Sequence, residues 1–246
     1  MQPFLLAIET STRTARVALV SMDGQVMSQA SLTADRHAAN LLNLCDQLFK
    51  ATHTTPAQLA AIACGAGPGS FTGLRVGMAM GKGLALPFAA PFVLQSSLHV
   101  LALDLAHESN APMGQTVVAC LDAGKGEVHA QPFTCSAPGV VTSAAEPWRL
   151  APSDLCERLR SAQPQFHALG GPELAKFPAL SAASAVAPMR LLPDVPGPSA
   201  VHLARLAWTA LANGHAVDLA TAAPTYGRGP DITTPKRKTV GDANAS

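Results

Sequence analysis

The segment from residue 65 to residue 83 constrains the fold more than any other part of this chain. It reads Gly-Ala-Gly-Pro-Gly-Ser-Phe-Thr-Gly-Leu-Arg-Val-Gly-Met-Ala-Met-Gly-Lys-Gly, a glycine-rich loop that runs straight into a helical pattern. Gly73, Gly77 and Gly81 repeat every four residues, so they lie along one ridge of that helix. Each glycine in a helix interior costs about 1 kcal/mol relative to alanine. The ridge therefore indicates that another backbone comes very close to this face.

Composition narrows the classes of protein to which the chain can belong. Apolar residues make up 48% of its 246 residues, charged residues make up 13%, and the formal net charge is +1. These values indicate a folded chain with a sizeable core. They argue against extensive nucleic-acid binding by the chain alone, because that needs a basic surface. The low share of charges also fits burial of some surface against a partner.

The cysteines and the N-terminus predict where the protein works. Five cysteines are scattered through apolar runs without a Cys-x-x-Cys pair, as expected of reduced core residues in a cytoplasmic protein. The first residues carry no basic region before their apolar run, so we expect no signal peptide. No segment reaches the roughly 18 apolar residues that a membrane-spanning helix needs. We therefore expect a cytoplasmic protein with no membrane partner.

Apolar periodicity predicts an α/β fold. Runs at 4–8 and 15–20, with a turn signal at 22–24 before Val26, predict a three-stranded antiparallel meander. Further patterns predict helices over 37–50, 71–86, 98–106 and 199–212, and strands over 60–64, 93–94, 117–121 and 127–133. The strand, loop, helix and strand around the glycine segment are typical of a sheet with parallel members. Loops are expected at 136–147 and 178–199, which are rich in Pro, Ala and Ser.

The glycine segment first suggests a phosphate-binding loop, but the known patterns fail. A Walker loop needs Gly-x-x-x-x-Gly-Lys-Ser/Thr, and here Val76 replaces the first glycine and Gly83 replaces the hydroxyl residue. The dinucleotide pattern Gly-x-Gly-x-x-Gly would need a glycine at Ser70. We therefore interpret the segment as a tight turn followed by close helix packing.

Candidate catalytic and metal-binding residues are sparse. No two histidines are four residues apart, so we expect no helical metal site. Gly-x-Ser-x-Gly is absent, and Ser70 or Thr72 is better explained as a helix cap. Glu9 and Asp122 end strands in the two halves of the chain, where such acids either hold a hydrated magnesium ion in a cleft or cap turns. Both interpretations stay open, and a catalytic triad is not excluded by one sequence.

The faces of the first two helices predict a partner. Leu41, Leu42, Cys45 and Leu48 share one face of the helix over 37–50, and Leu44 falls outside it. The next helix is apolar on one side at Phe71, Leu74, Met78 and Ala85, and on another at Gly73, Val76, Gly77, Met80, Gly81 and Leu84. A helix that is apolar on two sides is buried or lies between its own core and a partner. The two helices are expected to pack against a matching pair in a four-helix contact.

A long motif supports this expectation. It runs from Gly67 through Gly77 and continues at Lys82-Gly83-Leu84-Ala85. It resembles the TsaB family, the dimerisation subunit of the bacterial tRNA threonylcarbamoyladenosine machinery. Further matches keep the family's order over residues 4–228, at 7–12, Arg36-His37, Ser96-Ser97-Leu98, Leu121-Asp122-Ala123, Gly126-Glu127-Val128, Gly170-Gly171 and 224–228. Departures are Glu9 for the usual Asp, Gly124 for Arg, His129 for Tyr, and Gly227 for an apolar residue.

The resemblance implies a fold and a division of the chain. The fold is a two-lobed, actin-like (ribonuclease H-like) α/β fold with mixed sheets flanked by helices and a reduced second lobe. We expect an N-terminal lobe over 1–105 that carries the interface helices and a smaller C-terminal lobe over 106–228. A flexible tail is expected over 229–246, including Lys236-Arg237-Lys238.

The resemblance also implies a function, that of a non-catalytic scaffold. Its partner TsaD has the same fold, carries paired metal-binding histidines and transfers the threonylcarbamoyl group to the adenosine beside the tRNA anticodon. The segment Gln95–Val100 has no such pair, so neither metal ligands nor catalytic residues are expected. TsaD would bind as a heterodimer, TsaE would join a larger complex, a homodimer would form without TsaD, and tRNA would be met only through the complex. The expected interface is His37, Leu41, Leu44, Leu48, Gly73, Val76, Gly77, Met80, Gly81 and Leu84.

An alternative of another class is an autonomous actin-like nucleotide-binding hydrolase or a peptidase-like enzyme. Its cleft would be built from Glu9, Thr10, Ser11, Asp122, Gly170 and Gly171. If the chain is a scaffold, we expect it to bind no cofactor tightly and to bind ATP or ADP with magnesium weakly at most. A bulky residue at Gly77 is expected to abolish TsaD binding while the monomer stays folded.

Overall fold

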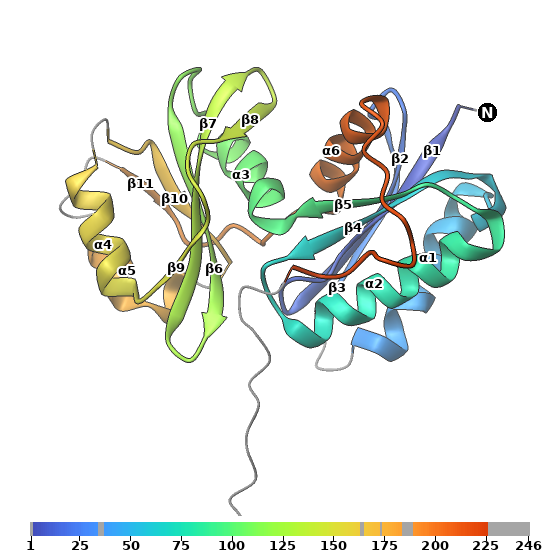
Figure 1. Ribbon diagram of the computed structural model, residues 1–246, viewed down its shortest axis with the longest axis horizontal. Coiled ribbons are helices and arrows are strands. Elements are labelled where there is room, and N and C mark those ends of the chain that lie inside the picture. The colour runs from blue at the N-terminus through green and yellow to red at the C-terminus, as the bar shows by residue number, and fades with distance from the viewer. Residues whose placement is uncertain (1, 34–36, 163–164, 173, 184–188, 226–246) are drawn as a thin grey trace, which may run out of the picture.

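The protein has two lobes that lie side by side, each built on one mixed β-sheet (Figure 1). The computed structural model describes residues 2–33, 37–162, 165–172, 174–183 and 189–225. The predicted tail over 229–246 lies outside these residues. Within the described chain, the lobes form the two-lobed α/β arrangement that the sequence predicts.

The first sheet begins with the predicted meander, which is confirmed. Its strand order is β3-β2-β1-β4-β5, with β1 antiparallel to β2 and parallel to β4. The strands are β1 (Phe4–Glu9), β2 (Thr14–Ser21), β3 (Val26–Thr33), β4 (Leu59–Gly67) and β5 (Phe92–Ser96). The parallel pairs β1–β4 and β4–β5 place the glycine loop after β4 at the carboxyl edge of the sheet.

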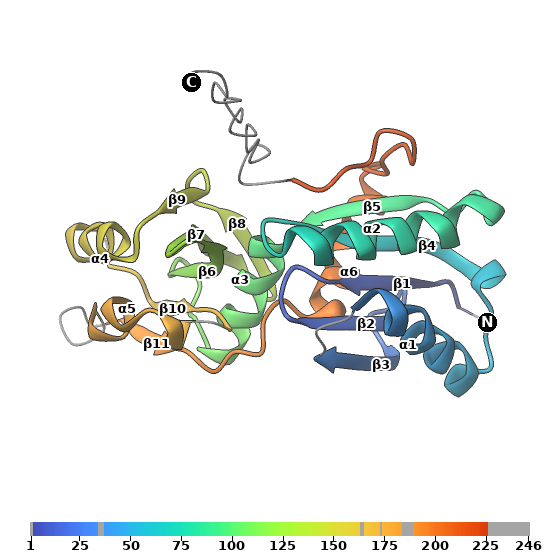
Figure 2. The ribbon, with the colours of Figure 1, turned by 90° about the horizontal axis from the view of Figure 1, so that it is seen from below.

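Helices cover both faces of the first sheet. Figure 2 shows α1 (His37–Thr52) and α2 (Phe71–Ala85) beside one another on one face. Their apolar side chains pack with alternate residues of β1, β2 and β4. The opposite face packs on α6 (Ala200–Ala212), whose small residues Ala200, Ala204 and Ala207 are buried against the sheet.

The second sheet has strand order β11-β10-β6-β7-β8, with β9 also paired to β7. Its strands are β6 (Thr116–Gly124), β7 (Glu127–Ala137), β8 (Val140–Ser143), β9 (Trp148–Leu150), β10 (Ala168–Gly170) and β11 (Arg190–Leu192). On one face lies α3 (Ser97–Glu108), and on the other lie α4 (Pro152–Ser161) and α5 (Pro178–Ala183).

Three expectations about the chain's course are wrong. Residues 140–143 and 190–192 are strands rather than loops, because they pair with β7 and β10, and residues 178–183 form a helix. The division at residue 105 also fails. Helix α3 begins before it yet belongs to the core of the second lobe, and α6 returns to the first sheet far beyond it. Burial of the apolar face of α6 on β1, β2 and β5 explains this return.

Candidate protein-docking surface

The predicted interface leucines on α1 are buried in the chain's own core. Leu41, Leu44 and Leu48 are at most 8% exposed and belong to the core between α1 and the first sheet, where α1 lies against β2 and β3. The prediction that Leu44 falls outside the core face is therefore wrong, as is the placement of Leu42 within it. Leu42 is 57% exposed, because positions 41, 44, 45 and 48 already fill the stripe that faces the sheet.

The glycine ridge also faces inward, which corrects its assignment to a partner helix. A Cβ atom on Gly73 would lie 2.2 Å from the carbonyl oxygen of Thr10, and one on Gly77 would lie 2.3 Å from the hydroxyl oxygen of the same residue. A Cβ atom on Gly81 would lie 2.5 Å from the sulfur of Cys64. The close backbone approach that the glycines permit is thus to the chain's own β1–β2 turn and β4.

The rest of α2 does present residues to solvent. Val76, Met80 and Leu84 lie along its flank toward α1 and are only partly buried. Ala79 and Gly83 are exposed, and no other group lies within 4 Å of a Cβ atom placed on Gly83. An open glycine on the outer face leaves room for another backbone, so Gly83 differs in this respect from the three buried glycines of the ridge.

A shallow hollow lies between the two helices. It has a volume of about 580 Å³, and its wall includes Leu42, Cys45 and Phe49 of α1, residues 53–56 and Leu84 of α2. Asp46 and Lys50 lie at the same place and form an exposed ion pair at 2.5 Å, so charges border the apolar floor. We call Leu42, Val76, Ala79, Met80, Gly83 and Leu84 the α1–α2 surface. The side chain of His37, the remaining predicted interface residue, lies outside the described residues.

Local sequence explains why α2 begins and ends where it does. The hydroxyl of Ser70 accepts a hydrogen bond from the amide of Gly73, which caps the helix as predicted. Pro87 follows the last turn and cannot continue the helix. Phe71, at the first turn, is 54% exposed with the Arg75 guanidinium 5.0 Å from its ring centre.

The predicted cleft residues of the first lobe are brought together but buried. Glu9, Thr10 and Ser11 are at most 3% exposed. The Glu9 carboxylate accepts hydrogen bonds from the amide of Ser11 at 2.7 Å and from the hydroxyl of Ser97 at 3.0 Å. Burial raises the pKa of Glu9, against the lowering effect of these donors and of Arg16.

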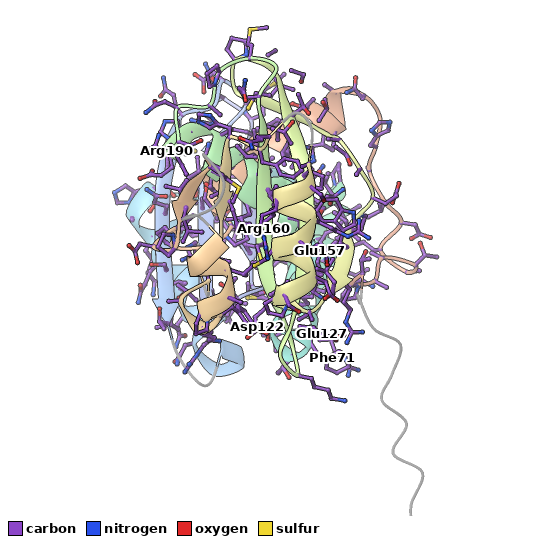
Figure 3. All side chains as sticks on the ribbon, turned by 90° about the vertical axis from the view of Figure 1, so that its left-hand side faces the viewer. Phe71, Asp122, Glu127, Glu157, Arg160 and Arg190 are labelled. Carbon is purple, nitrogen blue, oxygen red and sulfur yellow. The ribbon has the colours of Figure 1, made fainter. Side chains whose placement is uncertain are left out.

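The cleft residues of the second lobe are also engaged within the protein. Asp122 accepts from the amide of Gly124 and lies 3.3 Å from the ammonium of Lys176. Figure 3 shows Asp122 beside Glu127, at the opposite end of the lobe from Arg190. A Cβ atom on Gly171 would lie 1.9 Å from the carbonyl oxygen of Cys120, so this glycine serves packing.

The segment around Gly197 lies where the two lobes meet. A Cβ atom on Gly197 would lie 3.3 Å from both Thr12 and Arg16 of the first lobe and 3.4 Å from Pro172 of the second. The Arg16 guanidinium donates to the carbonyl of Pro196 in the same segment. Because both carboxylates already have protein partners, these residues do not fit a hydrated magnesium ion with a nucleotide. Weak nucleotide binding therefore stays a prediction that this geometry disfavours.

A larger cavity than the hollow on α1 and α2 lies elsewhere. It has a volume of about 880 Å³ and lies between β3, the end of α3 and the start of α6. Asp104 on its wall accepts from the amide of Ser199 and pairs with His202 at 2.6 Å. None of the six predicted cleft residues lines this cavity.

The described residues offer neither a metal site nor a membrane-spanning helix. They contain no group of three or more His, Cys, Asp or Glu side chains placed to hold a metal ion. No helix among them is both long and apolar enough to cross a membrane.

Comparison with known proteins finds similarity to tRNA-modification proteins. Residues 25–143 match the family model described as TsaD, tRNA N6-adenosine threonylcarbamoyltransferase. Over 125 residues the chain is 34% identical to the tRNA threonylcarbamoyladenosine biosynthesis protein TsaB of Escherichia coli and 35% identical to that of Haemophilus influenzae. Each alignment covers 51% of this chain, and the chain spans about half the length of these curated relatives, 52% and 51%.

Solved structures resemble the chain over a greater length. YeaZ from Pseudomonas aeruginosa superposes with a TM-score of 0.75 at 27% identity, covering 90% of this chain and all of that one. A second Pseudomonas aeruginosa structure, of a protein with similarity to peptidase YeaZ, has a TM-score of 0.76 at 28% identity, covering 92% of this chain and all of that one. With the two mixed sheets, these matches confirm the predicted actin-like fold.

Proposed function

We propose that this chain, which belongs to the TsaB family, is a non-catalytic subunit that binds TsaD through the α1–α2 surface. In this role it supports formation of N6-threonylcarbamoyladenosine in tRNA. The observation that carries the proposal is the exposure of Leu42 beside an open hollow where apolar residues of α1 meet Leu84 of α2, bordered by polar residues. Apolar side chains grouped at a hollow, unlike singly scattered ones, mark surfaces that partners cover.

The arrangement of the two helices defines what the partner must offer. Leu42 and Leu84 border the hollow from opposite helices, and Gly83 leaves the outer face of α2 open to close approach. A helix pair with apolar residues at helical spacing would fill the hollow and exclude water. TsaD is the proposed heterodimer partner, and a second copy of this chain would use the same surface when TsaD is absent. The chain would contact TsaE and tRNA only within the larger complex.

The enzyme alternative receives no support from the residues on which it rests. The carboxylate of Glu9 is turned into the protein, and that of Asp122 is held by Gly124 and Lys176. A nucleotide hydrolase would need these oxygens free to organise a metal ion and water. The scaffold proposal needs none of them, so it agrees better with the protein partners that both carboxylates already have.

Reconstitution of the modification tests the proposed function. Unmodified tRNA, threonine, bicarbonate and ATP would be incubated with the other subunits of the machinery, with and without this chain, and threonylcarbamoyladenosine would be measured by mass spectrometry. We expect modification to be lost when the chain is omitted and restored when it is added. Equal modification in both reactions would overturn the proposal.

A further inference from the structure

The side chain of Glu9 lies in a space that neighbouring residues of the folded chain leave open for it. Its side chain is fully buried, and a Cβ atom on Gly65 would lie 2.2 Å from its Oε2 atom. The missing side chain of Gly65 therefore provides the space for the carboxylate. Its two oxygens accept from different elements, Oε1 from the amide of Ser11 and Oε2 from the hydroxyl of Ser97.

The turn that follows Glu9 lies directly against α2. The carbonyl of Ser11 accepts a 2.7 Å hydrogen bond from the amide of Ser70, the residue that caps the helix. Thr10 contacts the backbone of α2 so closely that neither Gly73 nor Gly77 has room for a Cβ atom. Any shift of α2 along this contact must move Thr10, because close-packed interiors transmit displacement.

Ser97 carries the connection onward to the second lobe. It is the first residue of α3, which follows β5 without an intervening loop. The helix packs through Leu98, Leu101 and Leu105 into the core of the second lobe. Asp104, near its other end, is bonded to Ser199 and His202 of α6. Because Ser97 is part of α3, a displacement of Ser97 also displaces the helix that packs against the second sheet.

We propose that residues 9–12 are a mechanical relay that couples the position of the partner-binding helix α2 to α3 and the second lobe, with the Glu9 carboxylate as its link. This inference rests on the proposed function for the event that moves α2, namely docking of TsaD on the α1–α2 surface. Glu9 is a positioning residue, since it acts through Ser97 and touches no substrate. The two hydrogen-bond donors satisfy its buried oxygens.

Hydrogen exchange of the full chain, alone and saturated with TsaD, tests the relay. We expect TsaD to slow exchange of α1 and α2 amides and also to change exchange of α3 amides by about fivefold or more, the lower end of typical coupling. Ser97→Ala removes the link, so it should keep the α1–α2 protection and lose most of the α3 response. Ser109→Ala is the matched control, because its buried hydroxyl donates to Leu105 on the same helix but is not bonded to Glu9.

A second variant keeps the test informative if Ser97→Ala does not fold. Glu9→Asp is one methylene shorter and cannot reach both Ser11 and Ser97, so it should lose the α3 response in the same way. The relay is overturned if wild-type protein shows α1–α2 protection without an α3 response. It is equally overturned if either variant folds and keeps the wild-type α3 response.

Hydrogen exchange of the chain without TsaD distinguishes failure of the relay from failure of the proposed function. If TsaD protects neither helix, the proposed function fails, and Gly77→Ala then serves as the perturbation because its methyl group presses on Thr10. The relay predicts altered α3 exchange in the Gly77→Ala protein and little alteration when Ser97→Ala is added. The same alteration in both backgrounds would contradict it.

Discussion

A methyl group on Gly77 would lie 2.3 Å from the hydroxyl oxygen of Thr10, so α2 rests directly on the turn between the first two strands. This contact changes the role assigned to the glycine ridge of residues 65–83. The glycine ridge positions a helix on its own sheet, and the outer side of that helix is left for a partner.

Gly77→Ala is therefore expected to destabilise the fold itself, by about 1–3 kcal/mol, because the added methyl group overpacks a close contact. The free energy of unfolding from urea denaturation measures the effect. This replaces the expectation from sequence that a bulky residue at Gly77 leaves the monomer folded.

Gly83→Ala is the matched control on the same helix. No other group lies within 4 Å of the new Cβ atom, so the substitution should stabilise the protein by about 0.5–1 kcal/mol through its higher helix propensity. Equal effects of Gly77→Ala and Gly83→Ala would show that the ridge is not packed as described.

The sequence predicted most of the first lobe because its signals are local. Short apolar runs and turn signals place β1, β2 and β3, and the cap at Ser70 and the stop at Pro87 bound α2. The return of α6 to the first sheet was missed, because no local signal states which of two sheets an apolar helix will cover.

The docking surface was only half predictable for a similar reason. Leu42 and Leu44 both fit an apolar stripe, and only the packed sheet decides that Leu44 is buried and Leu42 is exposed. Likewise, the spacing of Gly73, Gly77 and Gly81 shows that something lies close, but it does not tell an internal strand from a partner. Gly83, the open position, could have been found by plotting which face the ridge leaves free.

Glu9→Gln is expected to change how stability depends on pH. Because burial raises the pKa of Glu9 above its ordinary value of 4.5, folding favours the protonated form. That contribution is complete below the unfolded pKa and is lost as pH rises through the folded pKa. Glutamine cannot ionise, so the stability of Glu9→Gln relative to wild type should increase with pH through that range. Urea denaturation of both proteins across a pH series measures this, and parallel curves would contradict the burial of an ionisable Glu9.

The cysteines are expected to be unreactive in the folded protein. All five are free and buried, and burial raises the pKa of Cys45 and of Cys120 to about 12. Since the thiolate is the reacting form, iodoacetamide at pH 8 should leave native protein unlabelled and should label all five cysteines in urea. Fast labelling of Cys64 in native protein would mean that α2 does not cover it as described.

The α1–α2 surface is the central claim, and affinity for TsaD tests it most directly. Calorimetric titration would compare the wild-type protein with Leu42→Asp and with Met113→Asp. Met113 is a comparably exposed apolar residue of the second lobe, 67% exposed against 57% for Leu42. A charge at the centre of a docked surface should weaken binding about thirtyfold, which corresponds to about 2 kcal/mol. We predict this loss for Leu42→Asp and unchanged affinity for Met113→Asp. Wild-type affinity in a folded Leu42→Asp protein would contradict the account.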